Sequence, residues 1–456
     1  MSSILASVVI PVYNKWELTE NCLKSLHQTL PLESCEVVVV DNASCDKTQE
    51  ACPALGRAFF GSNFIYHRSD TNLNFGPASN LGARLGRGSH VLFLNNDTIA
   101  APGWFEPLLN DFTDYANVAA TGPLLIYPGD GPLGPIVQHL GVFISPFYKV
   151  GHLYDGIPAC SSLAQKRRFF QIITAACMLM PKDLFLKHGG FDEEYINGFE
   201  DVDLCARLWN DGLRMTVNPD SRILHLTSQT PGRHDNETHN SRLFAAKVMN
   251  YLVPDWQMHL SADGLKLHLT EWQSLCIKMP ERHVEVLERI KVDGNIPMLC
   301  ELIAHNPFWY GGYLKLVELL RGAGRLEDAY GIMKSLARLY PAPANYFRLL
   351  EAARLMGDEK TLSFCVTCLR AFSNCFEHYS FLAEENAAFM ASIGLEDMAE
   401  QYQGWFESRF EFRSAVLHPF MVKIWDVMAK GRSMFEPWVY AAWRELIIQR
   451  EGAHER

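Results

Sequence analysis

The 456-residue chain lacks a long hydrophobic run and a charged N-terminal leader. No stretch of about 18 uninterrupted apolar residues is present, so the sequence predicts no membrane-spanning helix. The first six residues lead directly into an expected strand, without the charged and apolar regions of a signal peptide. We therefore expect a cytoplasmic protein, and the sequence leaves open a peripheral position at the inner face of the membrane.

A sustained basic tract is also missing. The chain has 41 Lys and Arg against 52 Asp and Glu, which gives a formal net charge of −11. Binding to a phosphate backbone depends on clustered positive charge, so we expect no nucleic-acid partner. The short basic cluster at residues 166–168 indicates a solvated turn or a local anion contact.

Twelve cysteines are present, but they are scattered and form no disulfide-like framework. Cys365 and Cys368 have the spacing of a metal or redox pair. No second pair or histidine follows at the distance of a zinc finger, so we expect buried helical cysteines instead.

Three apolar stretches each end in polar residues. They cover residues 7–14, 36–44 and 91–99, and the first two are followed by helical patterns. Repeated β-α units with fully apolar strands predict a parallel sheet covered by helices on both faces. Their polar ends favour a polar ligand at one sheet edge over three separate helix caps.

Two further polar features follow in the same half. Glu200, Asp201 and Asp203 open an expected helix over residues 199–209, where acids also suit the helix dipole. His225 lies near the end of an expected strand, and paired with Asp97 it becomes a candidate metal ligand. Residues 116–168 are rich in Gly and Pro, and we expect one strand over 138–144 and mostly loop elsewhere.

From about residue 252 the pattern indicates helices only. Gly324, Gly357 and Gly394 each precede an acidic helix start, at spacings of 33 and 37 residues. This period resembles tetratricopeptide-like helical repeats, with an irregular bundle as the alternative. The length exceeds what one core serves, so we expect two domains, residues 1–250 and 251–456. The helical domain and its late aromatic residues suit homodimerisation or a protein partner.

The N-terminal half resembles family 2 glycosyltransferases of the GT-A fold, nearest to the rhamnosyltransferase-like branch of bacterial surface polysaccharide synthesis. The resemblance covers about residues 7–247. It rests on six motifs in one order, completed by the later His225: Val-Val-Ile-Pro-Val-Tyr-Asn (8–14), Val-Val-Val-Asp-Asn-Ala-Ser (38–44), Asn-Leu-Asn-Phe-Gly-Pro-Ala-Ser-Asn (72–80), Leu-Asn-Asn-Asp (94–97), Gly-Gly-Phe-Asp-Glu (189–193) and Glu-Asp-Val-Asp-Leu (200–204).

The resemblance implies roles for residues of five of these motifs and for His225. The nucleotide-sugar would be held by Pro11, Tyr13, Asn14, Asp41, Asn72, Asn80, Asn95 and Asn96. Asp97 and His225 would bind Mn²⁺ or Mg²⁺ on the diphosphate, although Asn95 stands where the family's metal motif has its first Asp, a departure that would weaken the metal affinity. Asp201 would be the base that deprotonates the acceptor hydroxyl, with Glu200 orienting a substrate and Asp203 structural.

These roles imply an inverting, metal-dependent transferase that moves a sugar from a UDP- or dTDP-sugar to a glycan hydroxyl. Two alternatives stay open: a transferase acting on a protein such as flagellin, and a catalytically silent helical scaffold. For the polar segment at residues 227–235, closure over the diphosphate and an ordinary mobile loop are both open. A nucleotidyltransferase would need a Gly-rich basic loop after the first strand, and residues 11–14 are not such a loop.

Overall fold

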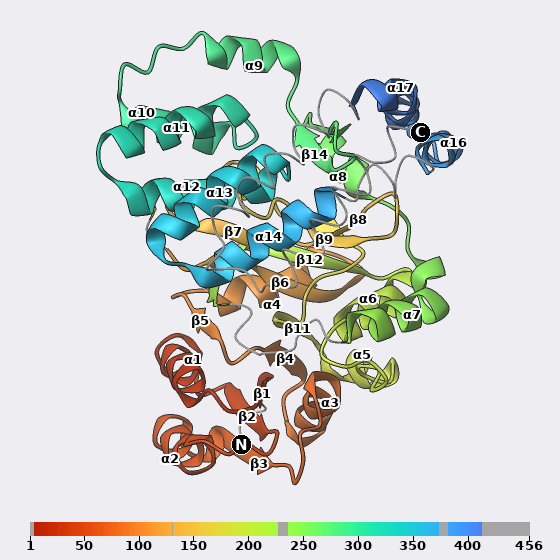
Figure 1. Cartoon of the computed structure of the whole chain (residues 1–456). Coiled ribbons are helices and arrows are strands. Elements are labelled where there is room, and N and C mark those ends of the chain that lie inside the picture. Colours follow the sequence, from red (N-terminus) through yellow and green to blue (C-terminus); the bar gives the residue numbers. More distant parts are fainter. Residues whose placement is uncertain (1–3, 130, 227–235, 374–381, 413–456) are drawn as a thin grey trace, which may run out of the picture. The chain divides into compact units, whose positions relative to one another are not determined.

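The computed structural model describes residues 4–129, 131–226, 236–373 and 382–412 (Figure 1). The chain divides into two compact units. The first comprises Met1–Asp263 and Pro297–Pro307, and the second comprises Gly264–Ile296 and Phe308–Arg456. The domain boundary expected near residue 250 stays a prediction.

The first unit is built on a ten-stranded sheet with the order β10-β12-β6-β11-β4-β1-β2-β3, in which β5 pairs with β12 and β7 with β6. A separate hairpin joins β8 to β9. The strands are β1 (Ala6–Val12), β2 (Cys35–Asp41), β3 (Phe64–Arg68), β4 (His90–Leu94), β5 (Thr98–Ala100), β6 (Val118–Tyr127), β7 (Ile136–His139), β8 (Val142–Ile144), β9 (Val150–His152), β10 (Arg168–Phe170), β11 (Cys177–Pro181) and β12 (Arg214–His225).

The four N-terminal strands β1 to β4 are parallel to one another, as predicted from their apolar composition. Beyond β4 the sheet is mixed, because β11 runs antiparallel to both β4 and β6 while β12 is parallel to β6. The predicted α/β class is therefore confirmed, with a mixed sheet in which β1, β2, β3, β4, β6 and β12 run in one direction.

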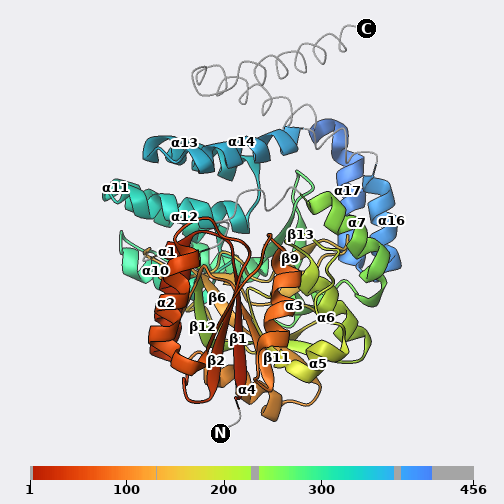
Figure 2. The same ribbon diagram turned by 90° about the horizontal axis from the view of Figure 1, so that it is seen from below.

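Helices cover both faces of this sheet (Figure 2). Val8 and Ile10 of β1 belong to a core cluster with residues of α1, α2 and α4. On the opposite face Val9 contacts α3 so closely that a Cβ at Gly82 would lie 2.3 Å from its side chain. The helices of this unit are α1 (Trp16–Thr29), α2 (Thr48–Phe60), α3 (Phe75–Leu85), α4 (Phe105–Asp114), α5 (Lys182–Lys187), α6 (Glu200–Asn210), α7 (Glu237–Lys247), α8 (Trp256–Ser261) and α10 (Ile296–His305).

The region from residue 116 to 168 contains more regular structure than predicted. Its first part forms β6, a buried ten-residue strand in the sheet interior. The single strand expected over residues 138–144 is instead split between β7 and β8. Gly122 and Pro123 lie inside β6, and these residue types disfavour strand interiors, which explains why the sequence pattern predicted loop.

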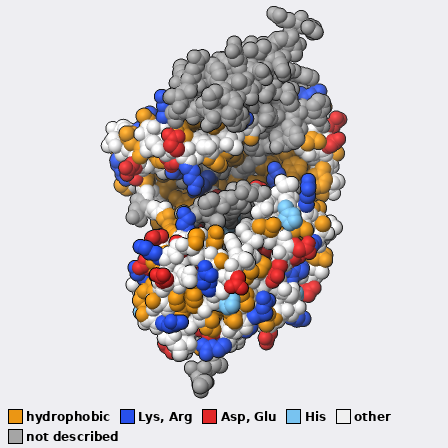
Figure 3. All heavy atoms as spheres, turned by 60° about the horizontal axis from the view of Figure 1, so that its bottom comes forward, with side chains coloured by type: hydrophobic (Ala, Val, Ile, Leu, Met, Phe, Trp, Pro, Cys, Tyr) orange, Lys and Arg blue, Asp and Glu red, His pale blue; other side chains and the backbone are white. Residues whose placement is uncertain are grey.

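The basic cluster at residues 166–168 makes local ion pairs. Lys166 and Arg168 each lie 2.7 Å from a carboxylate oxygen of Asp263, and Arg167 lies 3.3 Å from Asp111. The local anion contact is therefore confirmed, with carboxylates of the chain itself as the anions. On the face shown in Figure 3, Lys and Arg side chains are interspersed with Asp and Glu side chains.

The second unit is a series of helices with one hairpin of two strands. The helices are α9 (Glu281–Glu288), α11 (Tyr310–Gly322), α12 (Leu326–Leu339), α13 (Pro343–Met356), α14 (Glu359–Ser373), α16 (Ala383–Ser392) and α17 (Glu396–Phe412). The hairpin joins β13 (Lys266–Leu269) to β14 (Leu275–Lys278), and the sequence pattern did not predict it. Within the described ranges, no helix is long and apolar enough to cross a membrane.

The three glycines chosen from the sequence each end a helix and turn the chain into the next one. Gly324, Gly357 and Gly394 have φ of 74°, 67° and 76°, a conformation that glycine adopts without strain. The helical hairpins α11–α12, α13–α14 and α16–α17 are therefore confirmed. Cys365 and Cys368 are free thiols on α14, and Cys365 is buried. The predicted loop at 227–235 and the aromatic residues after 412 lie outside the described residues.

Candidate active site

The candidate site lies where the carboxyl ends of β1, β2, β4 and β12 meet. Val12 pairs with Asp41 across the ends of β1 and β2, and β4 lies on the other side of β1. After β4 the chain turns through residues 95–97 into β5, where Thr98 pairs with His225 of β12. Strand pairing thus brings together residues that are about 130 positions apart in the sequence.

Asp97 and His225 form the centre of the site. Oδ1 of Asp97 lies 3.2 Å from Nε2 of His225, and both residues are buried, at 8% and 4% exposure. Nδ2 of Asn95 lies 3.4 Å from the same nitrogen. The sequence predicted Asp97 and His225 as one pair, and the structure places them in contact.

The geometry of this pair fits a divalent cation. Two ligands at right angles on Mg²⁺ or Mn²⁺, each about 2.1 Å from the ion, lie about 3 Å apart. Among the described residues, no group of three or more His, Cys, Asp and Glu could hold a metal. A two-ligand protein site suits Mg²⁺ in particular, because this ion keeps several waters and is commonly completed by substrate phosphates.

The acidic cluster at the start of α6 divides into two environments. Oδ2 of Asp201 accepts a hydrogen bond from the N–H of Ala175 at 3.0 Å, and the next residue, Ala176, accepts one from the N–H of Asn95 at 3.0 Å. The segment 175–176 therefore connects Asp201 to the turn that carries Asp97. Glu200 is buried beside Asp201, at 5% exposure.

Asp203 faces away from this connection and is tied to the protein interior. It lies 2.7 Å from Nε of Arg207 and accepts a hydrogen bond from the hydroxyl of Tyr195. Burial raises the pKa of Asp203, and the positive charge of Arg207 opposes that rise. These contacts support the structural role predicted for this residue.

Several of the residues expected on the nucleotide side lie at the ends of β1 and β2 or directly after them. Asp41 is fully buried and accepts hydrogen bonds from the N–H of Ser44 at 2.8 Å and the hydroxyl of Tyr66 at 2.6 Å. The hydroxyl of Ser44 in turn accepts the N–H of Asn14 at 2.8 Å. Tyr13 is 46% exposed directly after β1, and Pro11, inside that strand, is partly buried.

The other predicted asparagines are placed less uniformly. Asn72 is exposed, and Asn96 donates to the hydroxyl of Thr19 on α1 at 2.9 Å. Asn80 is buried, and its amide binds both the N–H and the C=O of Phe191, at 2.9 and 2.8 Å. Its amide therefore holds the turn that precedes α6, and its predicted place in the nucleotide pocket stays a prediction.

Sequence reasoning missed Gln138 of β7. Its Oε1 lies 2.6 Å from Nδ1 of His225, so it contacts a predicted metal ligand directly. The available signal was a polar side chain within the apolar residues 136–144. The adjacent His139 is also buried, and burial lowers its pKa well below the ordinary value, with His152 and His225 adding to the effect.

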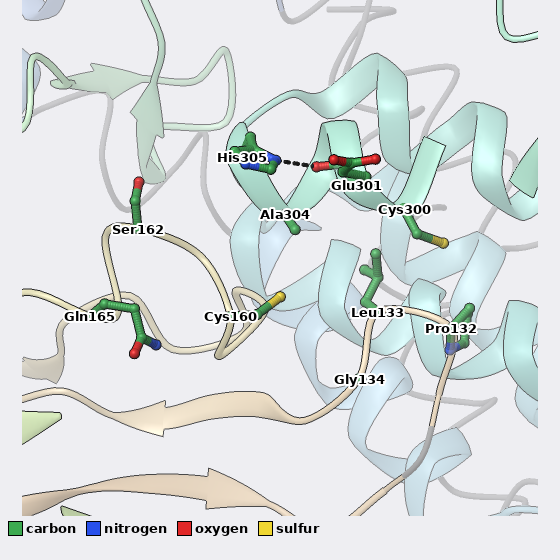
Figure 4. A pocket seen from close by; sticks show the side chains of 10 residues that line it. All are labelled: Pro132, Leu133, Gly134, Cys160, Ser162, Gln165, Cys300, Glu301, Ala304 and His305. Atoms are coloured by element: carbon green, nitrogen blue, oxygen red, sulfur yellow. Dashed lines mark hydrogen bonds between the residues drawn. The ribbon is translucent and has the colours of Figure 1, made fainter. Parts of the chain in front are cut away.

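A separate cavity of about 700 Å³ lies elsewhere in the first unit (Figure 4). The loops at residues 132–134 and 160–165 and the side chains of Cys300, Glu301, Ala304 and His305 on α10 line it. None of the predicted site residues is part of this lining. The cavity is therefore distinct from the Asp97–His225 pair.

Comparison with protein families identifies the N-terminal unit. Residues 7–166 match the model of glycosyl transferase family 2. The chain contains a family 2 glycosyltransferase domain. The resemblance predicted from the motif order is thus confirmed.

Curated relatives of the family 2 glycosyltransferase domain are distant. The O-antigen biosynthesis protein RfbC of Myxococcus xanthus is 24% identical over 369 residues, which cover 76% of this chain and 28% of the relative. The N-acetylglucosaminyl-diphospho-decaprenol L-rhamnosyltransferase of Mycobacterium tuberculosis is 28% identical over 215 residues, covering 43% of this chain and 68% of the relative. The chain thus spans little more than a quarter of the length of the first of these relatives.

Among solved structures, S. aureus TarS 1–349 aligns with 90% of this chain and 92% of its own, at 16% identity and a TM-score of 0.40.

Proposed function

We propose that the family 2 domain catalyses inverting, metal-dependent transfer of a sugar from a UDP- or dTDP-sugar to a hydroxyl of a glycan acceptor in bacterial surface polysaccharide synthesis. The observation that supports this most directly is the buried Asp97–His225 pair at the carboxyl ends of the parallel strands. Ligands of open α/β sheets bind at that edge. The names of the two curated relatives, an O-antigen biosynthesis protein and a rhamnosyltransferase, support the same class of acceptor.

Asp97 and His225 are the residues that would hold Mn²⁺ or Mg²⁺. When bound there, the cation stabilises the negative charge that develops on the nucleoside diphosphate as it leaves. Asn95 contributes a neutral amide beside the pair, so Asp97 supplies the one carboxylate of the motif at residues 95–97. The loops after β1 and β2 would bind the nucleoside, with the exposed ring of Tyr13 available for stacking on the base.

Asp201 is the group we assign to proton transfer. The acceptor hydroxyl loses its proton as it attacks the anomeric carbon, and a carboxylate at hydrogen-bond distance accepts it. The contact between Asp201 and the N–H of Ala175 holds the carboxylate beside the turn that carries Asp97. A single base and one displacement give inversion at the anomeric carbon.

Calorimetric titration with UDP, dTDP and GDP, each with and without Mn²⁺, tests the donor class and the cation. We expect one nucleotide to bind only with Mn²⁺, and Asp97→Ala to weaken that binding at least about 100-fold, because a direct carboxylate ligand is lost. Asp183→Ala, which removes an exposed carboxylate of α5, is the matched control and should bind as the parent does. Binding that is equal with and without Mn²⁺, or unchanged in Asp97→Ala, would contradict the proposal.

A further inference from the structure

The side chain of Gln138 makes two hydrogen bonds to one residue, His225. Its Oε1 lies 2.6 Å from Nδ1 of the imidazole, and its Nε2 donates to the backbone carbonyl of His225 at 3.0 Å. Both residues are buried, Gln138 at 5% and His225 at 4% exposure. The two come from different strands, β7 and β12, which both pair with the end of β6.

These two contacts determine which ring nitrogen carries the proton. A backbone carbonyl can only accept a hydrogen bond, so the NH₂ group of Gln138 must face it. The amide oxygen then faces Nδ1, and because this oxygen also only accepts, Nδ1 must be the donor. In the neutral imidazole the lone pair is therefore on Nε2, the nitrogen that faces Asp97.

We propose that Gln138 is a positioning residue that holds His225 in the Nδ1–H tautomer and directs the Nε2 lone pair toward the cation at Asp97. This inference rests on the proposed function for the identity of the cation, but the tautomer itself does not depend on it. An amide cannot take up the Nδ1 proton, so it fixes the tautomer without adding a negative charge beside Asp97. Partners of this kind orient metal-binding imidazoles and raise their affinity.

The tautomer is measured directly by ¹⁵N NMR on the full chain labelled with [¹⁵N]histidine, without metal, at a pH of about 9, where imidazoles are neutral. A His225→Asn variant identifies the His225 signals. We expect Nδ1–H in the parent and a shift toward Nε2–H in Gln138→Met, which keeps the side-chain length but has no amide. Nε2–H in the parent, or no change in Gln138→Met, would overturn the inference.

The consequence for the cation is measured by following free Mn²⁺ by electron paramagnetic resonance without nucleotide. Gln138→Met should bind Mn²⁺ about 10- to 100-fold more weakly than the parent. Gln138→Glu should bind within about threefold of the parent, because its carboxylate still accepts the Nδ1–H bond. Equal losses in both variants would indicate a purely structural role and overturn the inference.

Gln171→Met is the matched control for the loss of a buried amide. Gln171 is 2% exposed and binds the N–H and C=O of Val253, at 2.9 and 2.7 Å, without contacting a predicted ligand. It should leave the Mn²⁺ affinity within about twofold of the parent. A loss as large as that of Gln138→Met would refute the specific role of Gln138. A parent that binds no Mn²⁺ would instead refute the proposed function, while the NMR result still decides the tautomer.

Discussion

Asp201 and Asp203 lie on the same first turn of α6, yet their surroundings give them different tasks. Asp201 is partly exposed and makes its hydrogen bond to the backbone beside the Asp97 turn. Asp203 is 1% exposed, and its partner Arg207 also donates to the carbonyls of His188 and Gly190. Asp203 and Arg207 thus hold the turn before α6 in place.

Asp201→Asn should abolish most of the transfer without weakening donor binding. The amide cannot accept the acceptor proton, and a positioned base contributes about 10²- to 10⁴-fold to a rate. We expect kcat to fall by that factor while the calorimetric affinity for nucleotide and Mn²⁺ stays within about threefold. The change is checked by steady-state kinetics with the donor found in the calorimetric screen.

Asp203→Asn is the companion variant on the same helix turn. It removes one charge of a buried pair, so the protein should lose about 1 to 3 kcal/mol of unfolding free energy while kcat changes little. A larger loss of kcat in Asp203→Asn than in Asp201→Asn would reverse the two assignments.

At this scale the sequence identified the chemical groups better than their contacts. Asp97 and His225 were predictable because each lies at the polar end of an apolar stretch and the family resemblance includes both. The turn-holding contact of Asn80 with Phe191 was not predictable, since it joins residues 111 positions apart. Gln138 was missed for the same reason: nothing near it in the sequence indicates that β7 and β12 flank the same strand.

Among the elements, the helical hairpins of the second unit show how a local pattern determines a turn. At each of the three glycines, the residue after the glycine donates its backbone N–H to the carbonyl of the residue five positions before it. Arg325 donates to Leu320 in this way, and Asp358 donates to Ala353. This closes the helix end with the glycine in the left-handed region. Spacing, glycine and acidic start are all local signals, so these hairpins were predictable. The β13–β14 hairpin has only four residues per strand, too few for a periodic signal to be separated from loop.

Asp358 caps α14 and joins it to α12. Its Oδ1 accepts the N–H of Thr361 at 2.9 Å, and its Oδ2 lies 2.7 Å from the hydroxyl of Tyr330 and 3.2 Å from Nζ of Lys334. These donors hold the pKa of Asp358 well below its ordinary value, and the N–H of Thr361 has the largest effect. A carboxyl with a depressed folded-state pKa adds stability that is complete above its unfolded-state pKa and is lost as the pH falls through the folded-state value.

Asp358→Asn should therefore flatten the acid side of the stability profile. The amide still caps the helix, so we expect a cost of about 1 kcal/mol at pH 7 and a smaller further loss between pH 5 and pH 2 than in the parent. Urea unfolding at a series of pH values measures the unfolding free energy at pH 7 and its decrease between pH 5 and pH 2. Asp397→Asn, which breaks an exposed pair with Lys266, should follow the parent curve, and an equal flattening there would contradict the assignment.

The whole molecule consists of two compact units, and the candidate site lies entirely in the first. A ligand that binds only the folded first unit stabilises that unit by mass action, by about 2.7 kcal/mol at 100 times its dissociation constant. The second unit has its own hydrophobic core, so it can unfold independently of the first unit and of the ligand bound there.

We therefore expect calorimetric unfolding with two transitions, of which only one rises when nucleotide and Mn²⁺ are added. Asp358→Ala, which loses both the cap and the charge, should lower the other transition alone. Scanning calorimetry of the parent and this variant, each with and without ligand, tests both expectations. A single transition that rises with ligand and falls in the variant would show that the two units unfold together.

The division of the chain also affects how the protein is made. The first unit includes residues 297–307, so its last residue is Pro307, which lies 44 residues beyond Asp263 in the sequence. At about 5 to 20 residues per second, a ribosome needs about 2 to 9 s to add those residues. During that interval the nascent sheet domain lacks α10, and residues 264–296 of the second unit are synthesised before α10 is complete. A chaperone that shields apolar surface would have its greatest effect on the yield of this protein in those seconds.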